Sequence, residues 1–372
     1  MPNIKRGMMG AAGVSVVGTE ATLWAWGRNH KGQLGVNSVV DYSSPIQVGT
    51  DGDWASVSAG NFHTAAIKES GKLYTWGSGS IGQLGHGDAI SRSTPVQVGT
   101  LETWAYVSAS GNDGTCAIKT DGTLWSWGQR ERGAQGLGDY IRRSSPVQVG
   151  SLTNWSTVNM GTSQSVCAVK TDGTLWAWGN DMTGQLGQET TDIDYSSPVQ
   201  VGSLTNWESA QMGRFHMSMI KTDGTLWSVG YKTYLGNNDP SAHVSSPIQI
   251  GALTDWSKVG VGQNGTIAVK DDGSIWSWGK GFNKFTGFTT DVSSPTQIGS
   301  LTDWSTLGSQ HSSTGLAIKT DGTLWAWGEG SKGQLGNSTE TDDSSPTMVG
   351  TDIDWAKVSG NKYHVLAIKV QE

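Results

Sequence analysis

The chain repeats one unit of roughly 50 residues seven times, and this repeat restricts the fold more than any other feature. Each unit holds an aromatic pair such as Leu-Trp-Ala-Trp-Gly, a Ser-Pro or Thr-Pro step, a lone Trp, and a Lys that ends a short apolar run. The aromatic pairs and the lone tryptophans account for all 19 Trp of the protein. A length of 372 residues would otherwise suggest two or three domains. A fixed period instead indicates one closed repeat architecture.

Each unit contains four short segments that are typical of β-strands, and the two central segments form a hairpin. In residues 168–179, AVKTDGTLWAWG, two such segments flank Asp172 and Gly173. Asp-Gly between strands predicts a type I′ turn, in which both central residues have positive φ. No segment has the periodicity of a sustained helix. Seven four-stranded units predict an all-β, seven-bladed β-propeller.

The hairpin turns also predict how the ring closes. Six hairpins carry Gly at the second turn position: Gly71, Gly122, Gly173, Gly224, Gly273 and Gly322. The seventh equivalent position is Glu20-Ala21, and the chain ends where the seventh turn would begin. Strands near 355–369 are therefore expected to pair with strands near 22–26 and 45–49, so that both ends complete one blade. This closure removes free sheet edges, which would otherwise template aggregation.

Charge and composition limit the partners that the chain can bind. The formal net charge is −7 and no long run of Lys or Arg is present, which argues against a nucleic-acid partner. The absence of an apolar run of about 18 residues predicts no membrane insertion. Cys116 and Cys167 occupy the same position of successive repeats. They are expected to be too far apart for a disulfide and to be small buried hydrophobes.

Several segments resemble the repeats of the regulator of chromosome condensation family: WGRNHKGQLG (26–35), WGSGSIGQLG (76–85) and VSAGNFHTAAI (57–67). The resemblance covers about residues 19–369 and implies a seven-bladed propeller. The family includes a nucleotide exchange factor for the small GTPase Ran, a plant ultraviolet-B photoreceptor and a bacterial β-lactamase inhibitory protein. What these proteins share implies a propeller rim that acts as a binding surface, but it implies no particular partner.

No group of residues predicts catalysis, a cofactor or a metal site. His63, His216 and His364 occupy one equivalent repeat position but belong to different blades, whereas metal ligands must converge within a few Å. No Ser/His/Asp or Cys/His grouping, phosphate loop or dinucleotide fingerprint stands out. The Asp residues of the hairpins are explained by turn chemistry, and the Trp pairs are expected to pack between blades. We therefore expect a protein that is not an enzyme and needs no cofactor.

The repeat breaks in two consecutive loops, and such breaks are where function is expected. Loop 280–292 lacks Gly-Gln-Leu-Gly and carries three of the five Phe, while loop 231–243 follows a strand in which Val229 replaces Trp. Corresponding positions in consecutive repeats place these loops side by side on one rim, and loop aromatics are typical interface anchors. The alternative is that the Phe residues replace missing Leu packing. The predicted binding residues are Tyr231, Tyr234, Phe282, Phe285 and Phe288.

Arg142 and Arg143 in the third loop complete the predicted binding residues. They would contact an acidic partner, and the alternative is that both are solvated.

The sequence predicts two parts and one main function. Residues 1–18 form an N-terminal attachment or flexible segment, and residues 19–372 form the propeller. The stretch Asn3–Met9 resembles the start of repeat proteins of this family carried by marine phages. The main hypothesis is a non-catalytic adaptor of a phage virion that displays the propeller to a virion component or a host surface protein. The alternative is a soluble bacterial interaction or inhibitor module, cytoplasmic or secreted.

Overall fold

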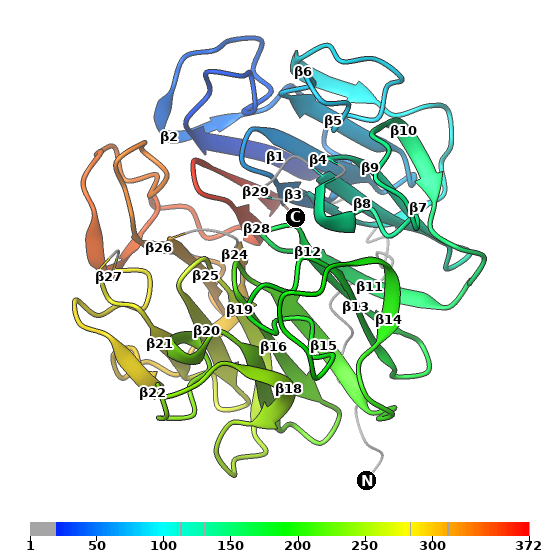
Figure 1. The fold of residues 1–372 in the computed structure, drawn as a ribbon. Helices are drawn as coiled ribbons and strands as arrows, with labels where there is room; N and C mark the ends of the chain where they lie inside the picture. Colours follow the sequence, from blue (N-terminus) through cyan, green and yellow to red (C-terminus); the bar gives the residue numbers. More distant parts are fainter. Residues whose placement is uncertain are drawn as a thin grey trace, which may run out of the picture.

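Seven β-sheets surround a common centre in the computed structural model of the chain (Figure 1). The structure describes residues 20–109, 111, 114–129, 131–282, 284–310 and 313–371. Six sheets have four strands, and the seventh has five because the short β24 (Ser309–Gln310) joins it. Within these described ranges the helical elements are two short 3₁₀ turns, η1 (Glu131–Gly133) and η2 (Lys232–Tyr234). The predicted all-β seven-bladed propeller is confirmed.

Each blade runs outward from an inner strand that begins at the lone Trp. The inner strands are β3 (Trp54–Ala59), β7 (Trp104–Ala109), β11 (Trp155–Met160), β15 (Trp207–Met212), β19 (Trp256–Val261), β23 (Trp304–Leu307) and β28 (Trp355–Gly360). The second strands are β4 (His63–Lys68), β8 (Gly114–Lys119), β12 (Ser165–Lys170), β16 (His216–Lys221), β20 (Gly265–Lys270), β25 (Thr314–Lys319) and β29 (His364–Gln371). We number the blades 1 to 6 in this order and call the last one the closing blade.

The two outer strands of each blade carry the aromatic pair and the Pro step. The third strands are β5 (Leu73–Gly77), β9 (Leu124–Gly128), β13 (Leu175–Gly179), β17 (Leu226–Gly230), β21 (Ile275–Gly279), β26 (Leu324–Gly328) and, in the closing blade, β1 (Glu20–Gly27). The outermost strands are β6 (Arg92–Gln97), β10 (Arg143–Gln148), β14 (Tyr195–Gln200), β18 (Val244–Gln249), β22 (Val292–Gln297), β27 (Asp343–Met348) and β2 (Tyr42–Gln47). Pro lies in the outermost strand because it has no N–H to donate to a further strand.

The N-terminal and C-terminal strands complete the closing blade together. β29 pairs antiparallel with β1 over eight residue pairs, from Glu20↔Gln371 to Gly27↔His364. The sheet order is β2-β1-β29-β28, with β24 beyond β28. Figure 1 shows the blue strand β1 beside the red strand β29. The predicted closure is confirmed, and no turn glycine is needed because no turn joins these two strands.

The Asp-Gly hairpins contain a different turn from the predicted one. Lys170 N donates to Thr174 O at 3.0 Å and Gly173 N donates to Lys170 O at 2.9 Å, so residues 171–173 form a three-residue loop. Gly173 has φ 76°, and Asp172 is absent from the positive-φ residues of the described chain. Asp172 Oδ1 instead accepts hydrogen bonds from the backbone N and the hydroxyl of Thr174. The type I′ prediction was wrong, because only the glycine of this loop needs the left-handed region.

The second Trp of an aromatic pair joins neighbouring blades. Trp76 is fully buried, and its Nε1 donates to the backbone carbonyl of Gln33 at 2.9 Å. Gln33 lies in the loop between β1 and β2, which we call the closing-blade loop. The lone Trp54 packs edge-on against Trp76 and Tyr74, with ring centroids 6.2 and 5.4 Å apart. The same indole-to-loop hydrogen bond recurs at Trp26, Trp127, Trp178, Trp278 and Trp327. The predicted packing of these rings between blades is confirmed.

The Gly-Gln-Leu-Gly loops are shaped to receive these rings. Leu34 is buried in the same cluster as Trp76. Gly35 has φ 77°, and a Cβ added there would lie 2.6 Å from Nε1 of Trp76. A larger residue would therefore be strained and would displace the indole. The motif is a packing element of the ring.

Blade 4 has Val229 where each of the other six blades has the second Trp. Val229 is buried in a cluster with Met212, Met217 and Met219. Three flexible thioether side chains can fill the irregular space beside a smaller residue. The lone Trp207 keeps its edge contact, with its ring centroid 5.9 Å from that of Trp227. Blade 4 therefore keeps a packed core without the joining indole.

Three buried histidines at one repeat position bridge adjacent blades. Their Nε2 atoms lie 2.8 to 3.0 Å from threonine hydroxyls in the pairs His63–Thr115, His216–Thr266 and His364–Thr64. Burial lowers the pKa of His63 to about 4 and the pKa of His216 and His364 to about 3. Each imidazole is therefore neutral at pH 7. No group of His, Cys, Asp and Glu within the described ranges could hold a metal ion.

Two further features concern the cysteines and the membrane. Cys116 and Cys167 are free and buried, as predicted, and burial raises the pKa of the Cys116 thiol to about 12 and raises that of Cys167 as well. None of the helices in the described part of the chain is long and apolar enough to cross a membrane.

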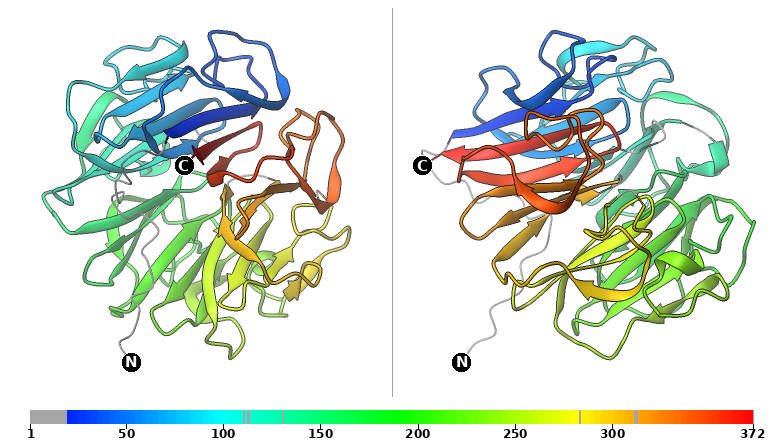
Figure 2. Two further views of the ribbon diagram at one scale, coloured as in Figure 1. Left: turned by 180° about the vertical axis from the view of Figure 1, so that it is seen from behind. Right: turned by 90° about the vertical axis from the view of Figure 1, so that its left-hand side faces the viewer.

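The strand ends form two faces of the ring. Neighbouring strands are antiparallel, so the turns from first to second strand and the loops from third to fourth strand share one face, which we call the loop face. The Asp-Gly turns lie on the opposite face, the turn face. Figure 2 (right) shows the end of β29 and the long loops pointing in opposite directions. On the turn face, the strand-ending lysines cover Trp rings, as Lys119 Nζ does 3.6 Å from the centroid of Trp125.

Deleting residues 355–372 should destroy cooperative unfolding, because it removes β28 and β29 and leaves β1 as an open edge. Thermal unfolding followed by Trp fluorescence measures this. Deletion of residues 1–12, which lie outside the described residues, is the control and should leave the transition nearly unchanged. A C-terminal truncation that melts like the parent chain would contradict the closure.

Trp178→Ala should lower the free energy of unfolding by about 3 to 5 kcal/mol, the range for emptying a large buried aromatic site. Trp178 is fully buried and its Nε1 donates to Ala134 O across the blade junction. Trp176→Ala is the matched comparison and should cost less, because that ring is half-buried and bonds to Thr174 of its own blade. Equal costs in urea titrations would refute the joining role of the second Trp.

The three buried histidines should make the protein sensitive to acid. Their pKa values lie below the unfolded value of about 6.5, so the unfolded chain binds more protons and stability falls as pH drops from about 6.5 towards 4. His216→Gln, which can still bond to Thr266, should reduce the stability lost between pH 7 and 4.5 by about 2 to 3 kcal/mol. Urea unfolding at both pH values measures this, with the exposed His243→Gln as control. An unchanged pH dependence in His216→Gln would reject the assignment.

Candidate interaction surface

A belt of backbone hydrogen bonds between consecutive blades holds the loop face together. In the closing-blade loop, Asn37 N donates to Ser93 O of blade 1 at 2.9 Å. Equivalent bonds, donor first, join Gly87–Ser144, Gly138–Ser196, Glu189–Ser245, Asn238–Ser293 and Ser338–Ser43. Each acceptor lies two residues before the Pro of an outermost strand, which gives the Ser-Pro step a structural role. These bonds join six of the seven blade junctions and fix loop 231–243 against the start of β22, whereas the described residues show no equivalent bond from loop 280–292 to Ser344 of blade 6.

The two irregular loops lie side by side on the loop face, as predicted. Asn238 in loop 231–243 of blade 4 donates its backbone N–H to Ser293 O at the start of β22 in blade 5. The hydroxyl of Ser293 donates to Asn238 Oδ1 at 2.7 Å. Loop 280–292 leads directly into β22.

Tyr234 and Phe285 occupy the position that Gln has in the Gly-Gln-Leu-Gly motif of other blades, and both side chains are buried. Phe285 is fully buried in a cluster that contains Trp304 and Trp327. Its backbone carbonyl accepts the Nε1 hydrogen bond of Trp327 at 2.9 Å, and the carbonyl of Tyr234 accepts that of Trp278 at 3.0 Å. The alternative that Phe serves packing therefore holds for Phe285, and the side chain of Tyr234 is buried in the propeller as well.

The other three aromatic residues of these loops are accessible to different degrees. Phe282 is 71% exposed. Tyr231 is half-buried, with its ring 4.6 Å from that of His243 and 5.1 Å from that of Tyr234. Phe288 is half-buried and lines a pocket of about 250 Å³ between blades 5 and 6. Phe282 is the residue of this group that a partner can contact most directly, and Tyr231 and Phe288 are each partly accessible.

The two predicted arginines of the third loop have different surroundings. Arg143 bonds to Asp139 Oδ2 at 2.8 Å and to Ile141 O at 2.9 Å. The backbone N–H of Ile141 and then Arg143 lower the pKa of Asp139. Arg142 is exposed. The structure thus ties Arg143 to its own loop and leaves Arg142 as the accessible cation of the pair.

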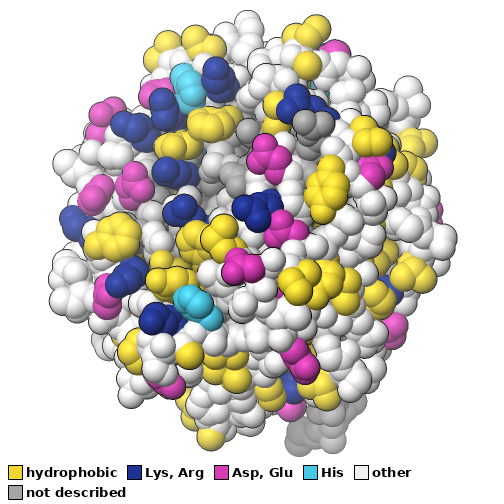
Figure 3. All heavy atoms as spheres, in the orientation of Figure 1, with side chains coloured by type: hydrophobic (Ala, Val, Ile, Leu, Met, Phe, Trp, Pro, Cys, Tyr) yellow, Lys and Arg dark blue, Asp and Glu magenta, His cyan; other side chains and the backbone are white. Residues whose placement is uncertain are grey.

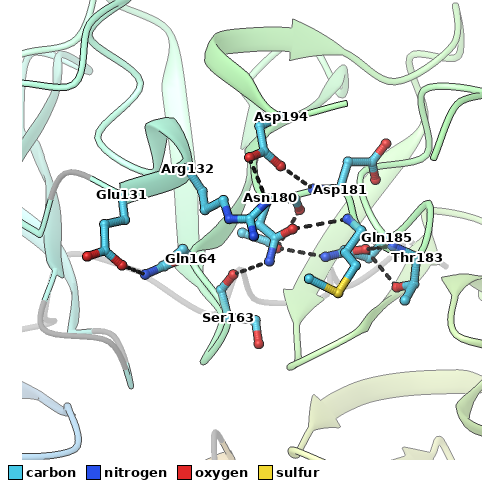
Figure 4. Close-up of polar contacts among 11 residues, drawn as sticks. Glu131, Arg132, Ser163, Gln164, Asn180, Asp181, Thr183, Gln185 and Asp194 are labelled. Carbon is cyan, nitrogen blue, oxygen red and sulfur yellow. Dashed lines mark hydrogen bonds and ion pairs between the residues drawn. The ribbon is translucent and has the colours of Figure 1, made fainter. Parts of the chain in front are cut away.

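A polar network joins blades 2 and 3 on the loop face (Figure 4). Arg132 Nη1 donates to Asp194 Oδ2 at 3.1 Å, and Asp194 Oδ1 accepts the backbone N–H of Asp181. Asp181 Oδ1 accepts the backbone N–H of Leu186, the bond that Asn29 makes to Leu34 in the closing blade. Burial raises the pKa of Asp181 to about 6. These carboxylates are satisfied inside the chain and act as parts of the scaffold.

Sequence analysis missed a cluster at the closing-blade junction, which we call the basic-aromatic cluster: Arg28, His30, Lys31, Phe62, Lys362 and Tyr363. Phe62 and Tyr363 stack with ring centroids 5.2 Å apart. Arg28 Cζ and Lys362 Nζ each lie 5.1 Å from the centroid of the Tyr363 ring. The sequence carries one signal for this cluster: Phe62 and Tyr363 each directly precede one of the buried histidines that bridge adjacent blades.

Family models identify the repeats directly. A model described as the regulator of chromosome condensation (RCC1) repeat matches residues 20–67, 70–118, 121–168, 172–220 and 321–368, well over half of the chain. A second model with the same description matches residues 54–83.

Individual relatives match only parts of the chain. The ultraviolet-B receptor UVR8 of Arabidopsis thaliana is 31% identical over 225 residues, which cover 58% of this chain and 51% of the receptor. Protein RCC2 of Mus musculus is 32% identical over 135 residues, which cover 34% of this chain and 26% of RCC2. The chain therefore spans about half the length of UVR8 and about a quarter of RCC2.

Solved structures match the whole ring. Prp20p of Saccharomyces cerevisiae has a TM-score of 0.84 at 18% identity, over 95% of this chain and 92% of Prp20p. Human WBSCR16 has a TM-score of 0.82 at 18% identity, over 94% of this chain and 98% of that chain. At this identity the likeness shows the fold alone. The five matched repeats within the seven-bladed ring show that the chain belongs to the regulator of chromosome condensation (RCC1) repeat family.

Proposed function

We propose that this chain is a non-catalytic binding protein that presents its loop face to a protein partner. The observation that carries the proposal is the belt of backbone hydrogen bonds, which joins six of the seven blade junctions on one face and fixes the irregular loop 231–243 against the start of β22. Pre-positioned loops bind without a large ordering cost. Prp20p, which shares this fold, binds Gsp1p and histones, and in a further structure it is bound by Kap60. These partners belong to Prp20p and support only a protein-binding role.

The residues that we assign to this surface are the accessible ones of the predicted set. Phe282 and Tyr231 supply aromatic surface, and Arg142 supplies an exposed cation. Aromatic and arginine side chains dominate the energetics of many protein interfaces. Phe285, Tyr234 and Arg143 hold the loops in place instead.

We propose the virion of a phage as the setting, with the propeller displayed to a virion component or a host surface protein. Two features of the sequence support this setting: the likeness of Asn3–Met9 to phage proteins of this family, and a chain with only 15% charged residues. Residues 1–18, the proposed attachment segment, lie outside the described residues.

A second candidate is a bacterial interaction or inhibitor module. The accessible aromatic loops favour it as much as they favour virion display, because both functions need one rigid binding face. The two candidates differ in where the protein is found.

Mass spectrometry of purified virions separates the two candidates. If the chain is a virion component, its peptides should be recovered from density-gradient-purified virions in an amount comparable to other structural proteins. Their absence from virions, with the protein recovered in the bacterial fraction, would favour the interaction or inhibitor module.

Phe282→Ala with Tyr231→Ala should weaken association with the virion or partner at least about thirtyfold, since truncating one interface anchor typically costs about 2 kcal/mol or more. Thermal unfolding should show a folded ring. The comparison variant is Phe285→Ala, which should lower the melting temperature because it empties a buried site. If the exposed pair leaves association intact and removal of residues 1–18 abolishes it, attachment resides in the N-terminal segment and not in the loops.

A further inference from the structure

The basic-aromatic cluster brings together three segments that are distant in the sequence. Arg28, His30 and Lys31 lie in the loop between β1 and β2. Phe62 lies in the turn between β3 and β4, and Lys362 and Tyr363 lie in the turn between β28 and β29. The His30 ring meets the edge of Phe62 with centroids 5.3 Å apart at 88°. All six side chains are exposed or half-buried. The cluster is therefore a surface feature of the loop face.

The cations of this cluster have no carboxylate partner among the described residues. Arg28, Lys31 and Lys362 take part in no ion pair there, whereas Arg92, Arg132 and Arg143 on the same face pair with Asp88, Asp194 and Asp139. The nearby Asp41 accepts the backbone N–H of Asn29 at 2.7 Å. Partial burial lowers the pKa of His30 most, the charges of Arg28 and Lys31 lower it further, and the charge of Asp41 opposes them.

This local positive charge differs from the charge of the whole molecule. The chain carries a formal net charge of −7. Figure 3 shows most of the Lys and Arg side chains of this view on its left half, which carries the closing blade and blades 5 and 6, with Asp and Glu side chains among them. Salt screens interactions beyond about 8 to 10 Å, so a contacting anion responds to the nearby cations more than to the net charge.

We propose that the basic-aromatic cluster binds an acidic segment, rich in Asp and Glu, of the partner protein. This inference rests on the proposed function and specifies the chemistry of the partner. Arg28 can hold a carboxylate through two parallel N–H bonds, while Lys31 and Lys362 act as flexible point charges. The ring edges of Phe62 and Tyr363 carry positive partial charge and suit carboxylate neighbours.

The same geometry disfavours a nucleic acid as the ligand. Phe62 and Tyr363 stack on each other, and Tyr363 also lies beneath two cations, so these rings offer little open face for stacking a base. The cluster has three cations, whereas a duplex-binding protein typically makes roughly six to ten phosphate contacts. A short acidic peptide segment matches both the size and the charge of the cluster.

The test uses the full chain and a fluorescein-labelled peptide of alternating Glu and Ser, with fluorescence anisotropy as the readout. The parent chain should bind this peptide, and binding should weaken as salt is raised. Arg28→Ala with Lys362→Ala should weaken binding at least about tenfold. Lys72→Ala, which removes a cation on the turn face, should leave binding unchanged. Matching melting temperatures show that each variant is folded.

Three results would overturn the proposal. The first is equal peptide affinity in the parent chain and the Arg28→Ala, Lys362→Ala variant. The second is tighter binding of oligo(dT) than of the acidic peptide, lost in the same variant, which would assign the cluster to nucleic acid. The third is a parent dimer that the variant converts to monomer in sedimentation experiments, which would assign it to a second copy. Peptide binding without recovery of the chain in virions would leave this inference standing and refute only the virion setting.

Discussion

The hydrogen bond from a buried indole to the loop of the preceding blade is the interaction on which this ring of sheets depends. A blade has two faces and cannot bury them alone, so each sheet needs its neighbours. Trp76 fills the junction between the closing blade and blade 1, and its N–H is satisfied by the carbonyl of Gln33. Because the acceptor belongs to a loop, the contact that packs two blades also positions the loop face.

The acceptor of this hydrogen bond is a backbone carbonyl, which every residue type provides. Tyr234 and Phe285 replace the usual residue at the acceptor position, yet their carbonyls still receive the indole hydrogen bonds of Trp278 and Trp327. The side chain at this position can therefore change while the ring stays closed. Even where the indole itself is lost, at Val229, buried methionines fill the junction. Loop chemistry can diverge from blade to blade on an unchanged scaffold.

Polar groups on and beneath the loop face fall into two kinds. His216 and Asp181 are buried, have partners within the chain and shifted pKa values, and hold blades and loops together. Arg28 and Lys362 lie at the surface over an aromatic ring, with no carboxylate partner in the described part of the chain. A buried polar group needs a hydrogen-bond partner within the chain, whereas a surface cation is solvated and remains available to a binding partner. This difference separates scaffold from candidate binding site more clearly than residue type does.

The sequence alone determined the all-β class, the seven blades and the closure at Glu20-Ala21, because these depend on periodic strands and on the presence or absence of a turn glycine. It also placed the two irregular loops side by side. Tertiary structure decided which loop aromatics are available: Phe282 is exposed and Phe285 is buried, because the indole of the next blade occupies the space beside Phe285. It also decided the contact between Arg28 and Tyr363, since only ring closure brings the two ends of the chain together.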